Sequence, residues 1–289
     1  MIERVAGKSE VRSAVADARR EGRTIALVPT MGALHEGHLS LVRAARLRAD
    51  FVVASVFVNP TQFGPGEDFD RYPRGIDADM ALLGDEGVDV VFAPSAESMY
   101  HDGTDVVIDP GELASRWEGA LRPGHFSGVA TVVAKLLNLV SPDLAFFGEK
   151  DYQQLRVITR MAAQLDFGVG IVGCPTVRDK DGLALSSRNS NLSVPERVAA
   201  LGLPEALEAA ARAVAWGEVG VAAIEVEMRE AASAHAGEGL SIDYAVVVDP
   251  NTLEPMELLD RPARALVSGR VGSTHLIDNC ALAPVKDVP

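Results

Sequence analysis

The sequence predicts an α/β fold: a doubly wound parallel sheet followed by a smaller α+β domain. Over the first 177 residues, short apolar runs rich in β-branched side chains alternate with segments of helical periodicity. A strand, a helix and a second strand in succession indicate right-handed parallel crossovers, from which such a sheet is built. Beyond residue 178, two long helices precede a group of strands, which is typical of an α+β domain. We therefore predict domains over residues 1–177 and 178–289.

The opening strand of the sheet is predicted over residues 24–28, a short apolar run that Pro29 closes. Apolar side chains then recur at near-helical spacing over residues 39–47, which predicts a helix. A loop containing Gly32 and Gly37 therefore connects a strand to a helix N-terminus. Unpaired N–H groups and the positive end of the helix dipole favour an anion there, and glycines let the backbone approach it closely.

His35 and His38 lie three residues apart at the predicted start of that helix, so both imidazoles can point toward one face of its first turn. Imidazoles beside a phosphate can donate hydrogen bonds and stabilise charge that builds up on its oxygens. The same spacing is compatible with half of a zinc site, or with surface or capping histidines. This loop alone leaves those alternatives open.

The rest of the first domain continues the alternation. Strands are predicted at 51–58, 88–92, 143–147 and 169–173, and helices near 11–18, 77–86, 131–140 and after residue 154. Residues 94–126 contain several Gly and Pro and read as a long irregular connection, typical of a lid or an interface. In the second domain we expect one long helix over 195–215, another over 221–235, and strands at 242–248, 265–270 and 275–277.

Two further strands end in polar loops, which a parallel sheet brings to the same edge as the histidine loop. One carries Asn59 and Gln62, whose amides suit a small polar organic substrate, although most glutamines merely cap or solvate. The other carries Lys150 and then Gln154. Lys150 could be an ordinary surface lysine, but its position directly after a strand favours a phosphate-facing role. At the domain boundary, Ser186–Arg188 could close over a triphosphate, but by itself this segment reads as a polar linker.

Composition limits the class of protein. The chain has 289 residues, of which 47% are hydrophobic and 24% charged, as in ordinary globular proteins. A net charge of −14 argues against a nucleic-acid partner, and no apolar run is long enough to cross a membrane. The N-terminus has no signal-peptide pattern, and Cys174 and Cys280 form neither a disulfide framework nor a metal-binding pair. We expect a cytoplasmic protein.

Five stretches of the chain resemble the pantothenate synthetase, or pantoate–β-alanine ligase, family in order and approximate spacing: VPTMGALHEGH, FVNPTQF, RPGHFSGVATVV, FFGEKDYQQ and LALSSRN. The resemblance covers nearly the whole chain. It implies a Rossmann-like fold of the nucleotidyltransferase superfamily, whose HxGH signature matches residues 35–38. It also implies a second, mobile nucleotide-binding signature at residues 185–188, where Leu185 replaces the common methionine.

The resemblance implies a two-step, AMP-forming ligation in pantothenate biosynthesis, on the route to coenzyme A. Pantoate would react with Mg-ATP to give pantoyl adenylate and pyrophosphate, and β-alanine would then displace AMP. ATP is thus expected as a substrate, with Mg²⁺ riding mainly on its phosphates and no protein metal ligand. The run Asp77-Ala78-Asp79 departs from the family pattern, which argues against a metal role for those carboxylates. A cytoplasmic homodimer is also implied.

The resemblance also implies roles for particular residues. His38 would be a proton donor at the reacting phosphate beside His35, Lys150 the main phosphate cation, and Ser186, Ser187 and Arg188 a closing segment. Gln62 would hold pantoate and β-alanine, Gln154 would hold pantoate, and Asn59 would bound their pocket. Arg122 and His125 would lie nearby. The expected contacts of ATP are Met31, Gly32, Ala33, Leu34, His35, Glu36, Gly37, His38, Gly148, Glu149, Lys150, Asp151, Val177, Leu185, Ser186, Ser187 and Arg188.

Three other functions remain open at this point. An adenylyltransferase would transfer AMP to a phosphate-bearing acceptor and stop there, but the FVNPTQF and DYQQ loops offer amides in place of the cations that such an acceptor needs. A non-catalytic nucleotide-binding module would show no turnover, either with His38 or with His38→Ala. A zinc enzyme would use His35 and His38 as ligands.

Overall fold

The computed structural model describes residues 2–67, 69–101, 103–236 and 239–284, with 234–236 as backbone alone. Its chain divides into two compact units. The first consists of Met1–Glu149 and Gln153–Thr176, and the second of Lys150–Tyr152 and Val177–Pro289. The short segment Lys150–Tyr152 therefore groups with the second unit, although its neighbours in sequence belong to the first.

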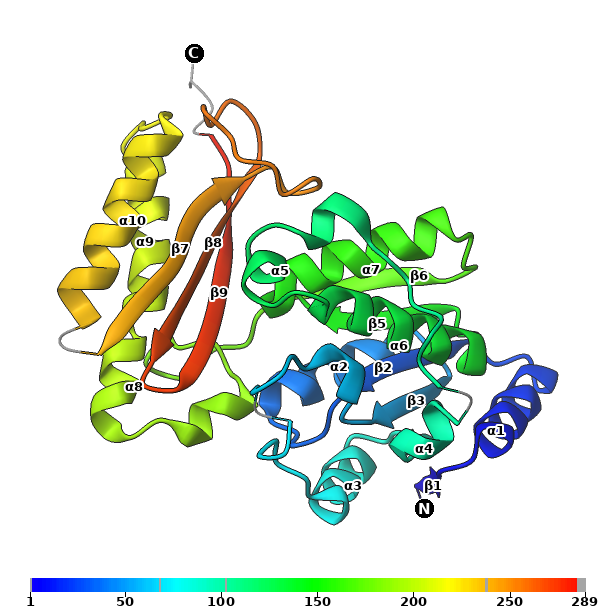
Figure 1. The fold of residues 1–289 in the computed structure, drawn as a ribbon. Coiled ribbons are helices and arrows are strands. Elements are labelled where there is room, and N and C mark those ends of the chain that lie inside the picture. The colour runs from blue at the N-terminus through cyan, green and yellow to red at the C-terminus, as the bar shows by residue number, and fades with distance from the viewer. Residues whose placement is uncertain (1, 68, 102, 237–238, 285–289) are drawn as a thin grey trace. The chain divides into compact units, whose positions relative to one another are not determined.

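The first unit is built on a six-stranded parallel sheet with the order β1-β4-β3-β2-β5-β6 (Figure 1). Its strands are β1 (Glu3–Val5), β2 (Ile25–Thr30), β3 (Phe51–Val56), β4 (Val90–Phe92), β5 (Leu144–Gly148) and β6 (Gly170–Cys174). From β2 the chain first runs outward to β3 and β4, and later returns to β5 on the other side of β2. The predicted doubly wound sheet is confirmed, and its switch point lies between β2 and β5.

Helices connect and cover these strands. They are α1 (Lys8–Arg20), α2 (Glu36–Arg46), α3 (Ile76–Asp85), α4 (Ala96–Met99), α5 (Glu118–Leu121), α6 (His125–Val140) and α7 (Tyr152–Gln164), with single 3₁₀ turns η1 (Pro60–Gln62), η2 (Gly111–Ala114) and η3 (Glu149–Asp151). Ala26 and Val28 of β2 pack with α2, whereas Ile25 and Leu27, equally buried, face the other side of the sheet. A strand buried on both faces reads as a continuous apolar run, which is why β2 was predictable.

Two expectations for the first unit were wrong in detail. Residues 94–126 are not wholly irregular, because α4, η2 and α5 lie within them. Helix α6 begins at His125, six residues before the predicted start, behind Gly124 with a φ of 83°. Gly128 inside it lies so close to the backbone of Thr61 that a Cβ there would meet the Thr61 carbonyl oxygen at 2.3 Å. Glycines lower helix propensity, so the sequence pattern concealed this first turn.

The second unit pairs helices with a three-stranded antiparallel sheet of order β7-β8-β9. Its elements are η4 (Ser187–Asn191), α8 (Val194–Ala200), α9 (Gly202–Ala215), α10 (Val221–Ala236), β7 (Leu240–Val248), β8 (Ala263–Val271) and β9 (Thr274–Leu282). One face of the sheet, with Ala265, Leu276 and Leu282, joins α9 and α10 in a hydrophobic core.

Two predictions for this unit were wrong. The single helix over 195–215 is two helices, α8 and α9, separated at Leu201. Pro204 has no N–H to donate to the carbonyl of Ala200, so an uninterrupted helix would lose that bond. Strand β9 spans nine residues where three were expected. Asp278 and Asn279 in the middle of β9 weaken its strand pattern in the sequence, because both residue types are depleted in strands.

Candidate active site

The loop between β2 and α2 is held from behind by Asp79 on α3. Asp79 is 3% exposed, and its carboxylate accepts the N–H groups of Ala33 at 3.1 Å and Leu34 at 2.9 Å. Gly32 and Ala33 adopt positive φ values of 82° and 51° to present these donors. Gly32 is required, since a Cβ there would lie 2.8 Å from Asp79 Oδ2. The N–H groups of Ala33 and Leu34 therefore donate to the protein's own Asp79 carboxylate and are not directed at a bound anion. The glycine pattern of the sequence did not predict this.

The imidazoles of the loop are oriented by the start of α2. His35 is the N-cap, and its Nδ1 accepts the Gly37 N–H at 3.2 Å. His38 Nδ1 in turn accepts the His35 N–H at 3.3 Å, and the two ring centroids lie 4.1 Å apart. A ring nitrogen that accepts a hydrogen bond carries no proton, so we assign each neutral ring to the Nε2–H tautomer. Each ring can therefore donate from Nε2 to a phosphate oxygen.

The amide loop after β3 meets the histidine loop, as the parallel topology predicts. Gln62 Nε2 donates to Met31 Sδ at 3.0 Å. Its Oε1 accepts from Asn59 Nδ2 at 3.1 Å, and Asn59 Oδ1 accepts the Tyr100 hydroxyl at 2.7 Å. Asn59 and Gln62 are both buried. This series of hydrogen bonds, from Tyr100 through Asn59 and Gln62 to Met31, fixes which end of the Gln62 amide donates and which accepts.

A second polar cluster lies behind the same loop. Arg122 donates from Nε and Nη2 to the Glu67 carboxylate at 2.9 and 2.6 Å, and its Nη1 lies 3.2 Å from His125 Nε2. His125 Nδ1 is 2.7 Å from the Gln62 carbonyl oxygen. Burial by itself would raise the pKa of Glu67, but the hydrogen bonds and charge of Arg122 lower it overall. This cluster supports the backbone that carries Gln62.

The next strand ends beside this loop. β5 pairs with β2 in parallel, so Gly148 at its carboxyl end and Glu149 after it lie at the switch-point edge of the sheet. Gln154 is half-buried on α7. Its neighbour Gln153 is buried, donates to the carbonyls of Leu113 and Arg116 at 2.9 Å each, and accepts the Glu118 N–H at 3.2 Å. Gln153 therefore holds the 113–118 segment.

The predicted site residues of the second unit form a hairpin and the turn after it. The Leu185 N–H donates to the Val177 carbonyl at 2.9 Å, and Arg178 and Ala184 pair in antiparallel fashion between them. Ser186 is the N-cap of η4, and its hydroxyl accepts the Arg188 N–H at 3.3 Å. Ser187 follows in the same turn. In the Lys150–Tyr152 segment of this unit, Lys150 is half-buried and Asp151 exposed.

Sequence reasoning missed the residues that hold the site residues in place. Asp79, Glu67 and Tyr100 contact Leu34, Arg122 and Asn59, which lie 41 to 55 positions away along the chain, and no sequence pattern marks such contacts. Within the described part of the chain, no group of three or more His, Cys, Asp or Glu is arranged to hold a metal ion. None of the described helices is long and apolar enough to span a membrane.

Comparison with known proteins identifies relatives along the whole chain. Residues 3–281 match the Pantoate-beta-alanine ligase family. The pantothenate synthetase of Rubrobacter xylanophilus is 55% identical over 281 residues, which cover 94% of this chain and 96% of the relative. That of Rhizorhabdus wittichii is 53% identical over 275 residues, covering 95% and 96%.

Solved structures agree. The crystal structure of pantothenate synthetase from Thermus thermophilus superposes with a TM-score of 0.92 at 48% identity, covering 98% of this chain and all of that one. A pantoate-beta-alanine ligase from Francisella tularensis, complexed with beta-gamma ATP and beta-alanine, gives a TM-score of 0.80 at 33% identity over 97% of each chain. The sequence and the fold together place this chain in the pantoate-beta-alanine ligase family.

Proposed function

We propose that the chain condenses (R)-pantoate with β-alanine to give pantothenate, through a pantoyl adenylate and with release of pyrophosphate and AMP. Membership of the ligase family supports the overall reaction. The observation that carries the residue-level mechanism is the pair of imidazoles at the start of α2, whose Nδ1 atoms accept backbone N–H groups, so that we assign the proton of each neutral ring to Nε2. ATP, pantoate and β-alanine are the substrates.

In the first step a pantoate carboxylate oxygen attacks the α-phosphorus of Mg-ATP. The bond from that phosphorus to the bridging oxygen breaks, and pyrophosphate leaves with the electron pair. Negative charge builds up on the phosphoryl oxygens, where fixed hydrogen-bond donors and cations stabilise it. His38 donates from Nε2 beside His35, Lys150 supplies the main positive charge, and Ser186–Arg188 contact the rest of the triphosphate. Met31–Gly37, Gly148–Asp151, Val177 and Leu185 complete the nucleotide contacts.

In the second step the β-alanine amine attacks the pantoyl carbonyl carbon. AMP leaves with the electrons of the acyl–oxygen bond, and the amine gives up a proton as the amide forms. AMP is a good leaving group, whereas the oxide of a free carboxylate is not. Gln62 holds pantoate and β-alanine, Gln154 holds pantoate, and Asn59 bounds the pocket and orients the Gln62 amide.

Mg²⁺ enters as part of the Mg-ATP substrate and neutralises charge on its phosphates. Asp79 is a poor candidate for a ligand, because both of its carboxylate oxygens accept backbone N–H groups. We further propose that the enzyme acts in the cytoplasm as a homodimer. We also propose that it works as two domains, 1–177 and 178–289, which differ from the two compact units in Lys150–Tyr152 and Val177, and that the second domain closes over the nucleotide during turnover.

Oxygen transfer tests the adenylate mechanism. Pantoate labelled with ¹⁸O in its carboxylate should deliver one labelled oxygen to the phosphate of AMP, because that oxygen bridges carbon and phosphorus in the intermediate. The expected result is one ¹⁸O per AMP by mass spectrometry. Unlabelled AMP, with all label retained in pantothenate and pantoate, would contradict the mechanism. AMP stably attached to an acceptor, with no release on adding β-alanine, would favour the adenylyltransferase alternative.

A further inference from the structure

Strand β9 carries two adjacent buried polar side chains. Asp278 and Asn279 are 3% and 4% exposed. Burying a carboxylate or an amide is costly unless its hydrogen bonds are made. Because side chains alternate along a strand, the two point to opposite faces of the sheet. Asp278 shares the face of Leu276 and Leu282, which pack in the core, and Asn279 points the other way. Each residue therefore needs its own partners.

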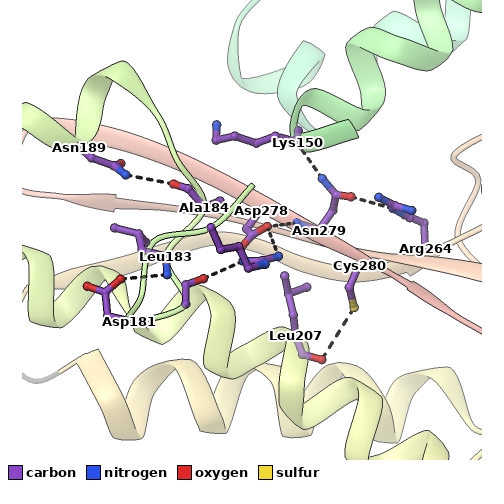
Figure 2. A network of polar contacts seen from close by, with 12 residues as sticks. Lys150, Asp181, Leu183, Ala184, Asn189, Leu207, Arg264, Asp278, Asn279 and Cys280 are labelled. Atoms are coloured by element: carbon purple, nitrogen blue, oxygen red, sulfur yellow. Dashed lines mark hydrogen bonds and ion pairs between the residues drawn. The ribbon is translucent and has the colours of Figure 1, made fainter. Parts of the chain in front are cut away.

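Both ends of the Asn279 amide are engaged (Figure 2). Its Nδ2 donates to the carbonyl oxygen of Lys150 at 2.8 Å, and its Oδ1 accepts from Arg264 Nε at 2.7 Å. A guanidinium can only donate, so Arg264 fixes the amide with its NH₂ toward Lys150. Arg264 also stacks on Tyr152, with Cζ 4.1 Å from the ring centroid, and the Tyr152 hydroxyl donates to the Pro250 carbonyl at 3.0 Å. The backbone carbonyl of Lys150 is thus held by β9, and the Tyr152 ring is held by Arg264 of β8.

Asp278 holds a different segment. Its carboxylate forms a bidentate pair with Arg178, at 2.6 and 2.9 Å, and Arg178 Nη1 also donates to the Gly182 carbonyl at 2.9 Å. Arg178 belongs to the 177–185 hairpin that leads directly into Ser186–Arg188. The Asn279 N–H donates to Asp278 Oδ1 at 2.7 Å, so the two side-chain networks join at β9.

We propose that Asn279 is a positioning residue for Lys150, and that the Asp278–Asn279 pair sets Lys150 at a fixed spacing from the hairpin that carries Ser186–Arg188. The proposal rests on the proposed function of Lys150 as the phosphate cation. A lysine is a point charge on a flexible stem, so the place its ammonium can reach depends on where its backbone is held. Figure 2 shows the Lys150 side chain extending away from the Asn279 amide, whose NH₂ donates to the Lys150 backbone carbonyl.

The informative variant is Asn279→Asp, which keeps an oxygen for Arg264 and replaces the donor to Lys150 with a second oxygen. Two half-reactions are measured on one preparation: pantoate-dependent pyrophosphate formation in a single turnover, and pantothenate formation from supplied pantoyl adenylate and β-alanine. Only the first contains a triphosphate. We expect the first to slow about 10- to 100-fold, as for a misplaced catalytic group, and the second to change less than about 3-fold. A loss of folded protein would lower both equally.

Cys280→Ala is the matched control, since Cys280 is the next residue of β9 and its Sγ lies 3.9 Å from the Leu207 carbonyl oxygen, in the core. It should leave the ratio of the two half-reactions unchanged. The decisive measurement is the first half-reaction of the double variant that combines Asn279→Asp with Lys150→Ala. If Asn279 acts through Lys150, Asn279→Asp should add less than about 2-fold to the effect of Lys150→Ala on the first half-reaction.

The outcomes separate this proposal from the function on which it rests. Full additivity of Asn279→Asp and Lys150→Ala, or equal loss in both half-reactions for Asn279→Asp, would overturn the positioning role while leaving the ligase mechanism intact. A Lys150→Ala enzyme with an unchanged first half-reaction would overturn the role of Lys150 and the positioning proposal together.

Discussion

The candidate site residues of the first unit and those of the second unit are held in place over very different distances along the chain. In the first unit, His35 and His38 are oriented by hydrogen bonds that span two and three residues, at the start of α2. In the second unit, Lys150 is held by a residue 129 positions away, and the hairpin before Ser186 by one 100 positions away. Hydrogen bonds between near neighbours can be predicted from the spacing of residues in the sequence. Contacts between residues 100 or more positions apart depend on the folded sheet.

Because hydrogen bonds between near neighbours orient His35 and His38, we expect substitution of these residues to act on the site itself. His38→Ala should lower kcat by about 10²-fold or more, since it removes a donor to charge that develops in the transition state. KM for ATP should change much less. Steady-state kinetics against ATP and pantoate measure both constants. His101→Ala, which alters an exposed histidine, is the control and should behave as wild type. Equal kcat values for the two variants would contradict the assigned role.

Asp79→Asn tests whether the site residues of the first unit also depend on a longer-range support. An amide has one oxygen to accept the two N–H groups of Ala33 and Leu34, so the loop should lose one bond and some of its order. We expect kcat to fall about 10-fold and the free energy of unfolding to fall by about 1 to 2 kcal/mol. Urea denaturation and steady-state assays measure these quantities. Asp77→Asn, on the exposed side of the same helix, should change neither.

Tyr100→Phe tests how the amide loop after β3 is held. The variant removes the hydroxyl that Asn59 Oδ1 accepts, and Asn59 in turn orients Gln62. We expect KM for pantoate to rise about 3- to 10-fold, the worth of one hydrogen bond, with kcat nearly unchanged. The increase should disappear in a Gln62→Ala background. A persistent increase there would show that Tyr100 acts on pantoate by another route.

The smallest effect concerns pH. The folded pKa of Glu67 lies below its ordinary value of 4.5, because Arg122 outweighs the effect of burial. A lowered carboxyl pKa contributes stability that is complete above the unfolded pKa and is lost as the pH falls through the folded one. The stability difference between wild type and Glu67→Gln should be about 1 to 2 kcal/mol at pH 7 and shrink below about pH 4.5. Denaturation across pH 3–7 measures it, with the exposed Glu97→Gln as control. A difference that grows on acidification would contradict this sign.

Sequence reasoning reached the fold class and the polar loops for physical reasons. Strands such as β2 and β3 are buried on both faces and therefore appear as apolar runs, and a parallel sheet brings the loops after them to one edge. It failed where tertiary contacts override local pattern. Gly128 lies in a helix because its lack of a Cβ allows the helix to pack against the Thr61 backbone. Asp278 and Asn279 lie in a strand because Arg178 and Lys150 complete the hydrogen bonds of their side chains. Of the two residues that obscured β9 in the sequence, Asn279 holds Lys150 and Asp278 holds the hairpin before Ser186.

Whether the enzyme activates pantoate as an adenylate is decided by pyrophosphate release from Mg-ATP, followed with and without D-pantoate and then with β-alanine. We expect no release with ATP alone, release limited to about one equivalent per active site with pantoate, and steady formation of AMP and pantothenate once β-alanine is added. Pyrophosphate release that does not depend on pantoate, or AMP that appears without pyrophosphate, would contradict it.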